Sequence, residues 1–113
     1  MDCIFCNITK GAIPADILHR DDDVMAFKDI NPKAPVHILI IPIKHIETVL
    51  DLSDEDNALI GKMVMVANQL AEKEGIDENG FRLVFNCREH GGQEVYHLHL
   101  HLMGGRSFRW PPG

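Results

Sequence analysis

The stretch Tyr96-His97-Leu98-His99-Leu100-His101-Leu102 alternates strictly, with a histidine at every second position and leucines between them. Successive side chains of a β-strand point to opposite faces, so the pattern predicts a strand over Val95–Met103 whose three imidazoles share one face. The leucines are expected on the other face, in the core. A solvated polar face is the simplest interpretation, but threonine or lysine would serve it better, and buried imidazoles cost desolvation energy. The stretch therefore indicates a functional site.

Two kinds of chemistry fit three such imidazoles. In a metal site, His97 and His101 would lie about 13 Å apart along a strand that rises about 3.3 Å per residue. Because zinc holds its nitrogen ligands at about 2.0–2.1 Å, two of the rings could share an ion, but three could do so only with severe bending. In a nucleophilic site, the middle imidazole attacks while its neighbours orient it and handle the proton of the leaving group. Neutral imidazole is a good nucleophile near pH 7, which suits phosphoryl or nucleotidyl transfer.

The residues before the histidines favour phosphorus chemistry. Gly91-Gly92-Gln93 predicts a turn whose backbone amides can approach an anion without a side chain in the way. Asn86 ends the preceding predicted strand and could donate to the same phosphate.

The composition narrows the class of protein. The 113 residues form one expected domain over residues 1–113, with 45% hydrophobic and 25% charged residues as in globular proteins. The apolar run Ile38–Ile41 is far shorter than the roughly 20 residues of a membrane helix. A net charge of −6 without a block of Lys and Arg argues against a nucleic acid polymer as partner, although not against a single nucleotide. Three cysteines, an odd number, predict reduced thiols in a cytoplasmic protein, with Cys87 as a buried residue of an apolar strand.

Periodicity predicts an α+β fold. Cys3–Lys10 is expected to form a short helix and Ser53–Glu74 a long one, with Ser53 as N-cap and Gly75 as the C-terminal stop. Alternating or β-branched runs predict an antiparallel sheet of about five strands. These strands are Ile17–Arg20, Val24–Ile30, His37–Ile41, Phe81–Cys87 and Val95–Met103.

The alternating histidine stretch resembles the signature of the histidine triad (HIT) superfamily, in which three histidines alternate with apolar residues. Further segments are similar to its Hint branch, the histidine triad nucleotide-binding proteins, and extend the resemblance from Cys3 onward. They are Phe27-Lys28-Asp29-Ile30, Ala34-Pro35-Val36-His37, Pro42-Ile43-Lys44-His45-Ile46, Gly91-Gly92-Gln93 and Trp110-Pro111-Pro112-Gly113. The resemblance implies the HIT fold and a two-fold homodimer. In the family, the long helix and the Phe81–Cys87 strand form the interface, and the tail reaches towards the partner's site.

The resemblance also implies an activity. By this match, His99 attacks the α-phosphorus of a purine nucleoside phosphoramidate, and water then releases the monophosphate from a nucleotidyl-histidine intermediate. His101 protonates the departing amine or orients its phosphate, while His97 and His37 line and order the site. The implied reaction converts adenosine 5′-monophosphoramidate and adenylated amines to AMP and requires no cofactor. A dinucleoside polyphosphate hydrolase of the same superfamily, or a regulatory purine nucleotide-binding dimer with incidental catalysis, is the alternative.

The family match assigns nucleotide contacts as well. Asp29 accepts the ribose hydroxyls or, in a structural interpretation, caps the loop before Pro32. Asn86 and the amides near Gly92 and Gln93 hold the phosphate oxygens, and Glu94 and Val95 are further nucleotide-binding residues. The apolar slot for the base, whose residues would also suit an ordinary core, comprises Ile4, Phe5, Ile8, Phe27, Ile30 and Leu39. Animal members carry serine where this chain has Glu94, which leads to the hypothesis that Glu94 favours amine-bearing leaving groups such as lysine.

Cys3 and Cys6 have the spacing of a zinc-binding thiol pair. HIT relatives such as the galactose-1-phosphate uridylyltransferases complete such a pair with two histidines, which by resemblance are His45 and His97. The sequence thus leaves open a structural zinc ion or two inert thiols.

Overall fold

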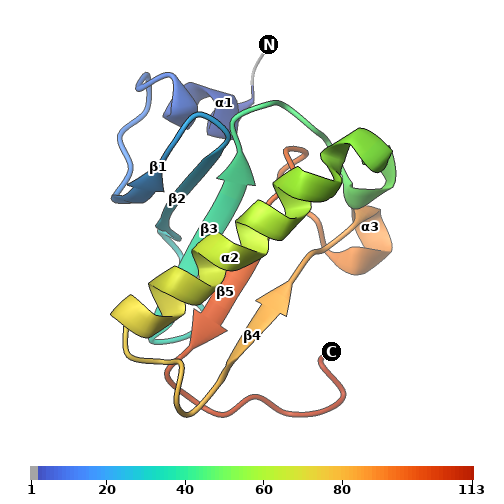
Figure 1. Ribbon diagram of the computed structural model, residues 1–113. Coiled ribbons are helices and arrows are strands. Elements are labelled where there is room, and N and C mark those ends of the chain that lie inside the picture. The colour runs from blue at the N-terminus through green and yellow to red at the C-terminus, as the bar shows by residue number, and fades with distance from the viewer. Residues whose placement is uncertain (1–2) are drawn as a thin grey trace.

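The computed structural model describes residues 3–113 as a twisted sheet flanked by helices (Figure 1). The sheet has five antiparallel strands in the order β1-β2-β3-β5-β4. The helices are α1 (Ile4–Thr9), α2 (Asn57–Lys73) and α3 (Arg88–Gly91), and the strands are β1 (Ile17–Arg20), β2 (Val24–Lys28), β3 (Val36–Pro42), β4 (Phe81–Val84) and β5 (Leu100–Gly104). This confirms the α+β class and the five-stranded antiparallel sheet.

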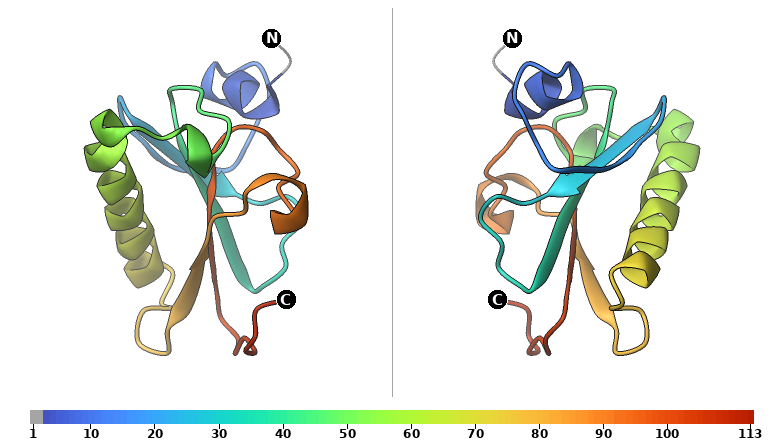
Figure 2. Two further views of the ribbon diagram at one scale, coloured as in Figure 1. Left: turned by 90° about the vertical axis from the view of Figure 1, so that its right-hand side faces the viewer. Right: turned by 90° about the vertical axis from the view of Figure 1, so that its left-hand side faces the viewer.

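Strand β3 lies at the centre of the sheet because its β-branched residues are covered on both faces. In the two side views of Figure 2, α2 lies along one face of the sheet, while α1 and α3 lie on the other side. Ile38 and Ile40 pack towards α2, whereas Leu39 and Ile41 pack towards α1. Among residues 3–113, no helix is long and apolar enough to span a membrane.

The leucines of the histidine stretch lie in the core as expected. Leu98, Leu100 and Leu102 are buried in the cluster beneath α2. The opposite face carries a smaller apolar cluster formed by Cys3, Phe5, Ile8, Met25, Phe27, Leu39 and Ile41. The two-sided alternation inferred from the sequence is therefore confirmed.

The extent of the histidine strand was predicted wrongly. Strand β5 begins at Leu100, so Val95 to His99 lie outside the ladder. The Leu98 N–H donates to Ile46 O at 2.6 Å instead of joining the sheet. On one side of this segment, β4 ends at Val84. On the other side, Pro42 at the end of β3 has no N–H for a ladder bond, so the backbone before Leu100 bonds to the loop that follows β3.

Other element boundaries also differ from the predictions. β2 ends at Lys28 rather than Ile30. The long helix is α-helical only over Asn57–Lys73, because a 3₁₀ turn at Asp54–Asp56 comes first. The Ser53 N–H donates to the Asp56 carboxylate at 3.0 Å, so Ser53 begins that turn.

The segment after β4 holds a helix that the sequence pattern did not predict. Because β4 ends at Val84, Cys87 is not a buried strand residue but a partly exposed N-cap of α3. Gly92 ends α3 with a φ of +78°, a left-handed conformation that glycine adopts without strain. The predicted Gly-Gly turn is thus the C-terminal end of a short helix.

Candidate active site

Four histidines gather on the face of the sheet that α1 covers. His37 lies on β3 and His101 on the adjacent strand β5, while His97 and His99 come just before β5. The Phe5 ring of α1 meets the rings of His97 and His99 edge-on, with centroids 5.9 and 5.2 Å apart. The His99 and His101 ring centroids are 5.0 Å apart. The structure therefore brings the three imidazoles of the alternating stretch, His97, His99 and His101, onto one face. Of these three, only His101 belongs to a strand.

The hydrogen bond of His99 defines which of its nitrogens can attack. His99 Nδ1 lies 2.7 Å from the carbonyl oxygen of His97, which can only accept. The ring proton is therefore on Nδ1, and Nε2 keeps a free lone pair. A buried neutral imidazole with one nitrogen fixed as donor presents the other as a nucleophile.

A second chain of hydrogen bonds orients His101. The Lys33 N–H donates to His37 Nδ1 at 3.0 Å, which places the proton of His37 on Nε2. That Nε2–H donates to His101 Nδ1 at 2.9 Å. Because Nδ1 of His101 accepts this bond, the ring proton of neutral His101 is on Nε2, where it is available to a substrate.

Asp29 lies beside this chain and has two partners. Its Oδ2 is 3.4 Å from His37 Nε2, and its Oδ1 accepts the Asn31 N–H at 2.8 Å. The predicted cap on the loop before Pro32 is therefore present, while the other carboxylate oxygen faces His37.

Burial keeps these imidazoles neutral. Desolvation lowers the pKa of His37, His97 and His99 below the usual 6.5. Desolvation, followed by the neighbouring His99 and His37, lowers the pKa of His101 to about 4. At neutral pH the site thus holds uncharged rings, the form in which imidazole acts as a nucleophile.

Gln93 has a role that the sequence did not reveal. Its buried side chain donates from Nε2 to Glu47 O at 2.7 Å and to Val95 O at 3.0 Å, while Oε1 accepts the Arg88 N–H at 2.9 Å. These bonds hold Arg88 with a φ of +58°, an uncommon conformation for a residue other than glycine. The side chain of Gln93 therefore shapes the turn whose amides were predicted to hold phosphate.

The predicted residues of the base slot occupy two environments. Phe5, Ile8, Phe27 and Leu39 are buried together, with Val95 packed against the same cluster. Ile4 and Ile30 have exposed fractions of 45% and 87%. Asn86 follows β4 and is partly buried, next to the backbone of α3.

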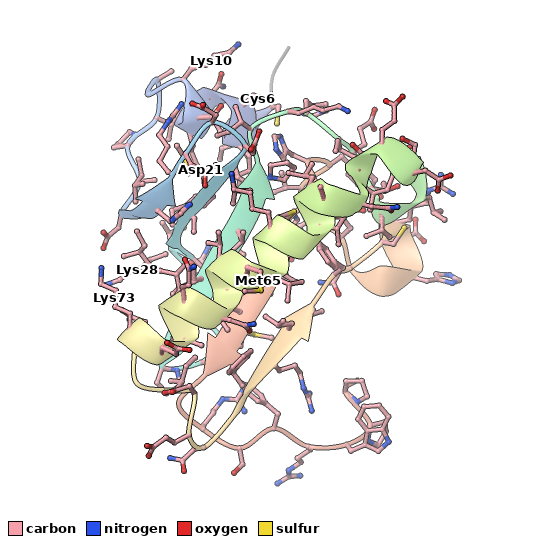
Figure 3. The ribbon with its side chains drawn as sticks, in the orientation of Figure 1. Cys6, Lys10, Asp21, Lys28, Met65 and Lys73 are labelled. Carbon is pink, nitrogen blue, oxygen red and sulfur yellow. The ribbon has the colours of Figure 1, made fainter. Side chains whose placement is uncertain are left out.

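Cys3, Cys6, His45 and His97 form a compact group that we call the thiol cluster. Cys6, labelled in Figure 3, projects from α1 towards the loop after β3, where His45 Nδ1 lies 3.4 Å from its Sγ. His97 Nδ1 lies 3.3 Å from Cys3 Sγ and 3.2 Å from His45 Nδ1. A tetrahedral zinc site with ordinary bond lengths has edges of about 3.6 Å between sulfur and nitrogen and about 3.4 Å between two nitrogens.

The hydrogen bond on the far side of His97 also fits a metal ligand. His97 Nε2 donates to Pro42 O at 2.8 Å, so Nδ1 turns its lone pair towards the two thiols. A metal-bound histidine usually donates its other N–H to such an acceptor. The side chains of the thiol cluster therefore fit a tetrahedral zinc ion.

Asp29, His37 and His101 form a second group with ligand atoms within 4.8 Å of one another, which we call the carboxylate cluster. Because the Lys33 N–H occupies His37 Nδ1, Nε2 carries a proton and has no lone pair for a metal. This cluster is built to hold protons.

A buried imidazole with a free ring nitrogen, flanked by two further imidazoles on an antiparallel sheet, is the arrangement of histidine triad proteins. The family model described as "Scavenger mRNA decapping enzyme C-term binding" matches residues 2–108. The chain belongs to the histidine triad (HIT) family.

Individual relatives are similar over nearly the whole chain. A purine nucleoside phosphoramidase of Escherichia coli strain K12 is 54% identical over 105 residues, which cover 93% of this chain and 88% of that protein. The crystal structure of a HIT family hydrolase from Legionella pneumophila superimposes with a TM-score of 0.97 at 53% identity, covering 99% of this chain and all of the other. A histidine triad protein from Clostridium difficile gives 0.93 at 44% identity, covering 96% and 95%.

Proposed function

We propose that this protein is a purine nucleoside phosphoramidase that hydrolyses adenosine 5′-monophosphoramidate and related adenylated amines to AMP. The observation that carries the proposal is the hydrogen bond from His99 Nδ1 to His97 O, which leaves His99 Nε2 as a nucleophile. The 54% identity to a protein named as a purine nucleoside phosphoramidase supports the choice of substrate.

The reaction takes place in two displacements at phosphorus. His99 Nε2 attacks the α-phosphorus and forms a P–N bond, while the bond to the amine nitrogen breaks and its electron pair stays on that nitrogen. His101 gives the nitrogen a proton from Nε2. Water then attacks phosphorus, the P–Nε2 bond breaks, and the proton lost by water returns to His101. AMP and the free amine are the products, and both histidines regain their starting forms.

The surrounding residues place the nucleotide. The Asp29 carboxylate keeps acceptor capacity for the ribose hydroxyls beside its contacts with His37 and Asn31, and the buried apolar residues around Phe5 and Phe27 suit a purine. The N–H groups of Gly92 and Gln93 were predicted to hold phosphate but donate to Glu89 O and Arg88 O at the end of α3, both at 3.0 Å. Asn86 and the amides of Glu94 and Val95 would therefore hold the phosphate oxygens, where charge develops in the transition state.

A zinc ion in the thiol cluster is part of the proposal. Cys3, Cys6, His45 and His97 would hold it, and the ion would supply a structural link rather than a reacting group. The link would join α1 to the segment that precedes β5, and it would fix the ring of His97 whose carbonyl oxygen binds His99.

A homodimer and a cytoplasmic location complete the proposal. Met65 has an exposed fraction of 57% and lies on the outward face of α2 (Figure 3), which suits an interface built on that helix. Within residues 3–113, Cys3, Cys6 and Cys87 form no disulfide, which suits a reducing compartment.

Removing the nucleophile tests the proposed function. We expect His99→Ala to lower turnover of adenosine 5′-monophosphoramidate by at least about 10³-fold, with AMP binding largely retained in calorimetry. His19→Gln, a histidine outside the site that is bonded to Asp21, should keep full turnover. Retained turnover in His99→Ala would refute the mechanism. Faster cleavage of a diadenosine polyphosphate by the unaltered protein would favour the other hydrolase branch, and binding without any turnover would favour a regulatory dimer.

A further inference from the structure

Residues 106–109, which come soon after β5, are held against the sheet by arginine and aromatic side chains. The ring of Phe108 has the guanidinium group of Arg106 4.3 Å from its centroid and that of Arg82 5.1 Å from it. Arg82 lies on β4 and also donates from Nη2 to Arg109 O at 3.0 Å. The chain that leaves β5 therefore runs past the start of β4 on a defined path (Figure 1).

Arg106 links this segment to the connection between β2 and β3. Its Nη2 donates to Lys33 O at 2.9 Å, across 73 positions of the chain, and its Nη1 donates to Ser107 O at 3.1 Å. The donors of a guanidinium group point in fixed directions within one plane. Two carbonyl oxygens and the Phe108 ring therefore hold this group in one orientation, and the group in turn holds the carbonyl oxygen of Lys33.

The backbone next to Arg106 packs against the same connection. Gly105 has a φ of +91°, and a Cβ atom there would lie 2.8 Å from Pro35 Cβ, closer than two such atoms approach. Gly104 pairs with Val36, the first residue of β3. The connection is thus fixed to the end of β5 at three successive points, and Arg106 provides the one farthest from the ladder.

The main chain of Lys33 carries this contact on to the histidines. The Lys33 N–H donates to His37 Nδ1 at 3.0 Å, and His37 Nε2 donates to His101 Nδ1 at 2.9 Å. Only two soft dihedral angles relate the N–H and C=O groups of one residue, so a fixed carbonyl oxygen limits the directions that the N–H can take. Arg106 is therefore three hydrogen bonds away from the ring of His101.

We propose that Arg106 is a positioning residue for the reaction, because it holds the Lys33 backbone in the conformation whose N–H determines the tautomer of His37. This inference rests on the proposed phosphoramidase function. Arg106 acts through Lys33 and His37 on His101, the proposed proton donor to the departing amine. Its role is therefore in proton transfer and not in binding of the nucleotide.

Steady-state kinetics with adenosine 5′-monophosphoramidate give the first test. Without Arg106, the Lys33 N–H is less well aligned with His37 Nδ1, and some molecules carry the ring proton of His101 on Nδ1, away from the substrate. Because the bond to Lys33 O is exposed to solvent, we expect Arg106→Ala to lower kcat only about three- to tenfold, with little change in KM. Arg106→Lys, which keeps a donor, should recover part of the loss.

The matched control is the arginine three positions later. Arg109 is exposed like Arg106, but its hydrogen bond with Arg82 is accepted by its backbone carbonyl oxygen. Arg109→Ala changes the net charge by the same amount, keeps that bond and should keep kcat. A loss of the same size in Arg109→Ala would assign the effect to charge and overturn the positioning role.

Nitrogen NMR of the imidazole rings, on isotope-labelled protein, reports the tautomers without any turnover. In the unaltered protein we expect the ring proton on Nε2 of His37 and His101, and on Nδ1 of His99. Arg106→Ala should give His37 a mixture of both tautomers, while His99, whose Nδ1 donates to His97 O, keeps its own. A general loosening of the structure would not change one histidine and leave the other unchanged.

A double-mutant cycle assigns the loss of kcat to the relay from Lys33 to His101. In His37→Gln this relay is already broken, so adding Arg106→Ala should cause no further loss of kcat. A loss in the single variant that disappears in the His37→Gln background distinguishes a positioning role from a general effect on the fold.

The results that would overturn the positioning role differ from those that would overturn the proposed function. An unchanged kcat in Arg106→Ala, a loss mainly in KM, an unchanged tautomer of His37, or an equal loss with and without His37 would remove the role of Arg106 and leave the function standing. Absence of turnover in the unaltered protein would overturn the proposed function, while the tautomers measured by NMR would still show whether Arg106 holds His37.

Discussion

The thiol cluster and the carboxylate cluster each combine histidines with side chains that can carry negative charge, and we propose different chemistry for the two. Each brings together two histidines and one or two potential anionic ligands, all within 4.8 Å. Both lie on the α1 face of the sheet, at opposite ends of the row of imidazoles. The proximity of the side chains therefore does not by itself distinguish the metal site and the proton relay that we propose.

The backbone makes the difference. In the thiol cluster, the Pro42 carbonyl oxygen accepts from His97 Nε2 and turns the lone pair of Nδ1 towards the sulfur atoms. In the carboxylate cluster, the Lys33 N–H donates to His37 Nδ1 and keeps a proton between the rings of His37 and His101. One acceptor and one donor of the main chain thus fix the tautomers, and the tautomers fix the chemistry.

Metal binding should separate the two clusters most strongly. We expect one zinc ion per chain, and a Cys6→Ser variant with zinc affinity at least about 100-fold lower because a thiolate ligand is lost. Chelation should lower the Tm of the unaltered protein by about 10 °C or more. A free zinc concentration of about 1,000 times the Kd would stabilise the folded state by about 4 kcal/mol. Competition with a coloured chelator and thermal unfolding measure both effects.

The matched control alters the other cluster. Asp29→Asn should keep one zinc ion per chain with unchanged affinity, because the carboxylate cluster offers no lone pair on His37 Nε2. A second zinc ion in the unaltered protein that disappears in Asp29→Asn would show that both clusters bind metal. No zinc in either protein would leave Cys3 and Cys6 as inert thiols.

Breaking the proton relay should affect turnover less than removing His99 does. His37 acts through His101 and is a positioning residue, so we expect His37→Gln to lower kcat for adenosine 5′-monophosphoramidate about 10- to 100-fold with little change in KM. Lys33→Ala keeps the backbone N–H that orients His37 and should keep full activity. A loss in His37→Gln that appears mainly in KM would indicate a substrate contact instead of a positioning role.

The faces of the histidine stretch were predictable because alternation with leucine determines which side enters the core. Leu98 is buried beneath α2 although it lies outside β5, so burial follows the side-chain pattern even where the ladder has ended. The start of the strand was not predictable in the same way. It depends on which backbone groups the neighbouring strands offer: Pro42 has no N–H, and β4 ends at Val84.

The composition of the site was predictable only in part. The family resemblance placed His45 with Cys3, Cys6 and His97, and it placed His37 in the lining of the site. The structure brings His45 to Cys6 and His37 to His101. The groups that set the tautomers are main-chain atoms of Lys33 and Pro42, which carry no signal in residue type. The Gln93 side chain donates to the backbone carbonyl oxygen of Glu47, 46 positions away in the chain, a separation at which a single sequence shows no pattern.

The smallest expected effect concerns the pH dependence of stability, to which the carboxylate cluster contributes through His101. Its pKa is about 4 in the folded protein because of burial, and about 6.5 in the unfolded chain. Between these values the unfolded chain binds more protons, so this contribution to stability is complete above pH 6.5 and is lost as the pH falls towards 4. Near pH 5.5, we expect the His101→Asn variant to bind about one proton fewer on unfolding than the unaltered protein does. Its free energy of unfolding should therefore decrease less steeply as the pH falls.

Urea unfolding at several pH values between 4.5 and 8 measures this slope, with a chelator present so that release of metal from the thiol cluster does not contribute. The unaltered protein and His101→Asn should have parallel stabilities above pH 7 and should diverge below pH 6. Identical slopes in the two proteins would mean that His101 titrates alike in the folded and unfolded states. The ring would then be accessible to protons, and the neutral relay from Lys33 through His37 would not hold in solution.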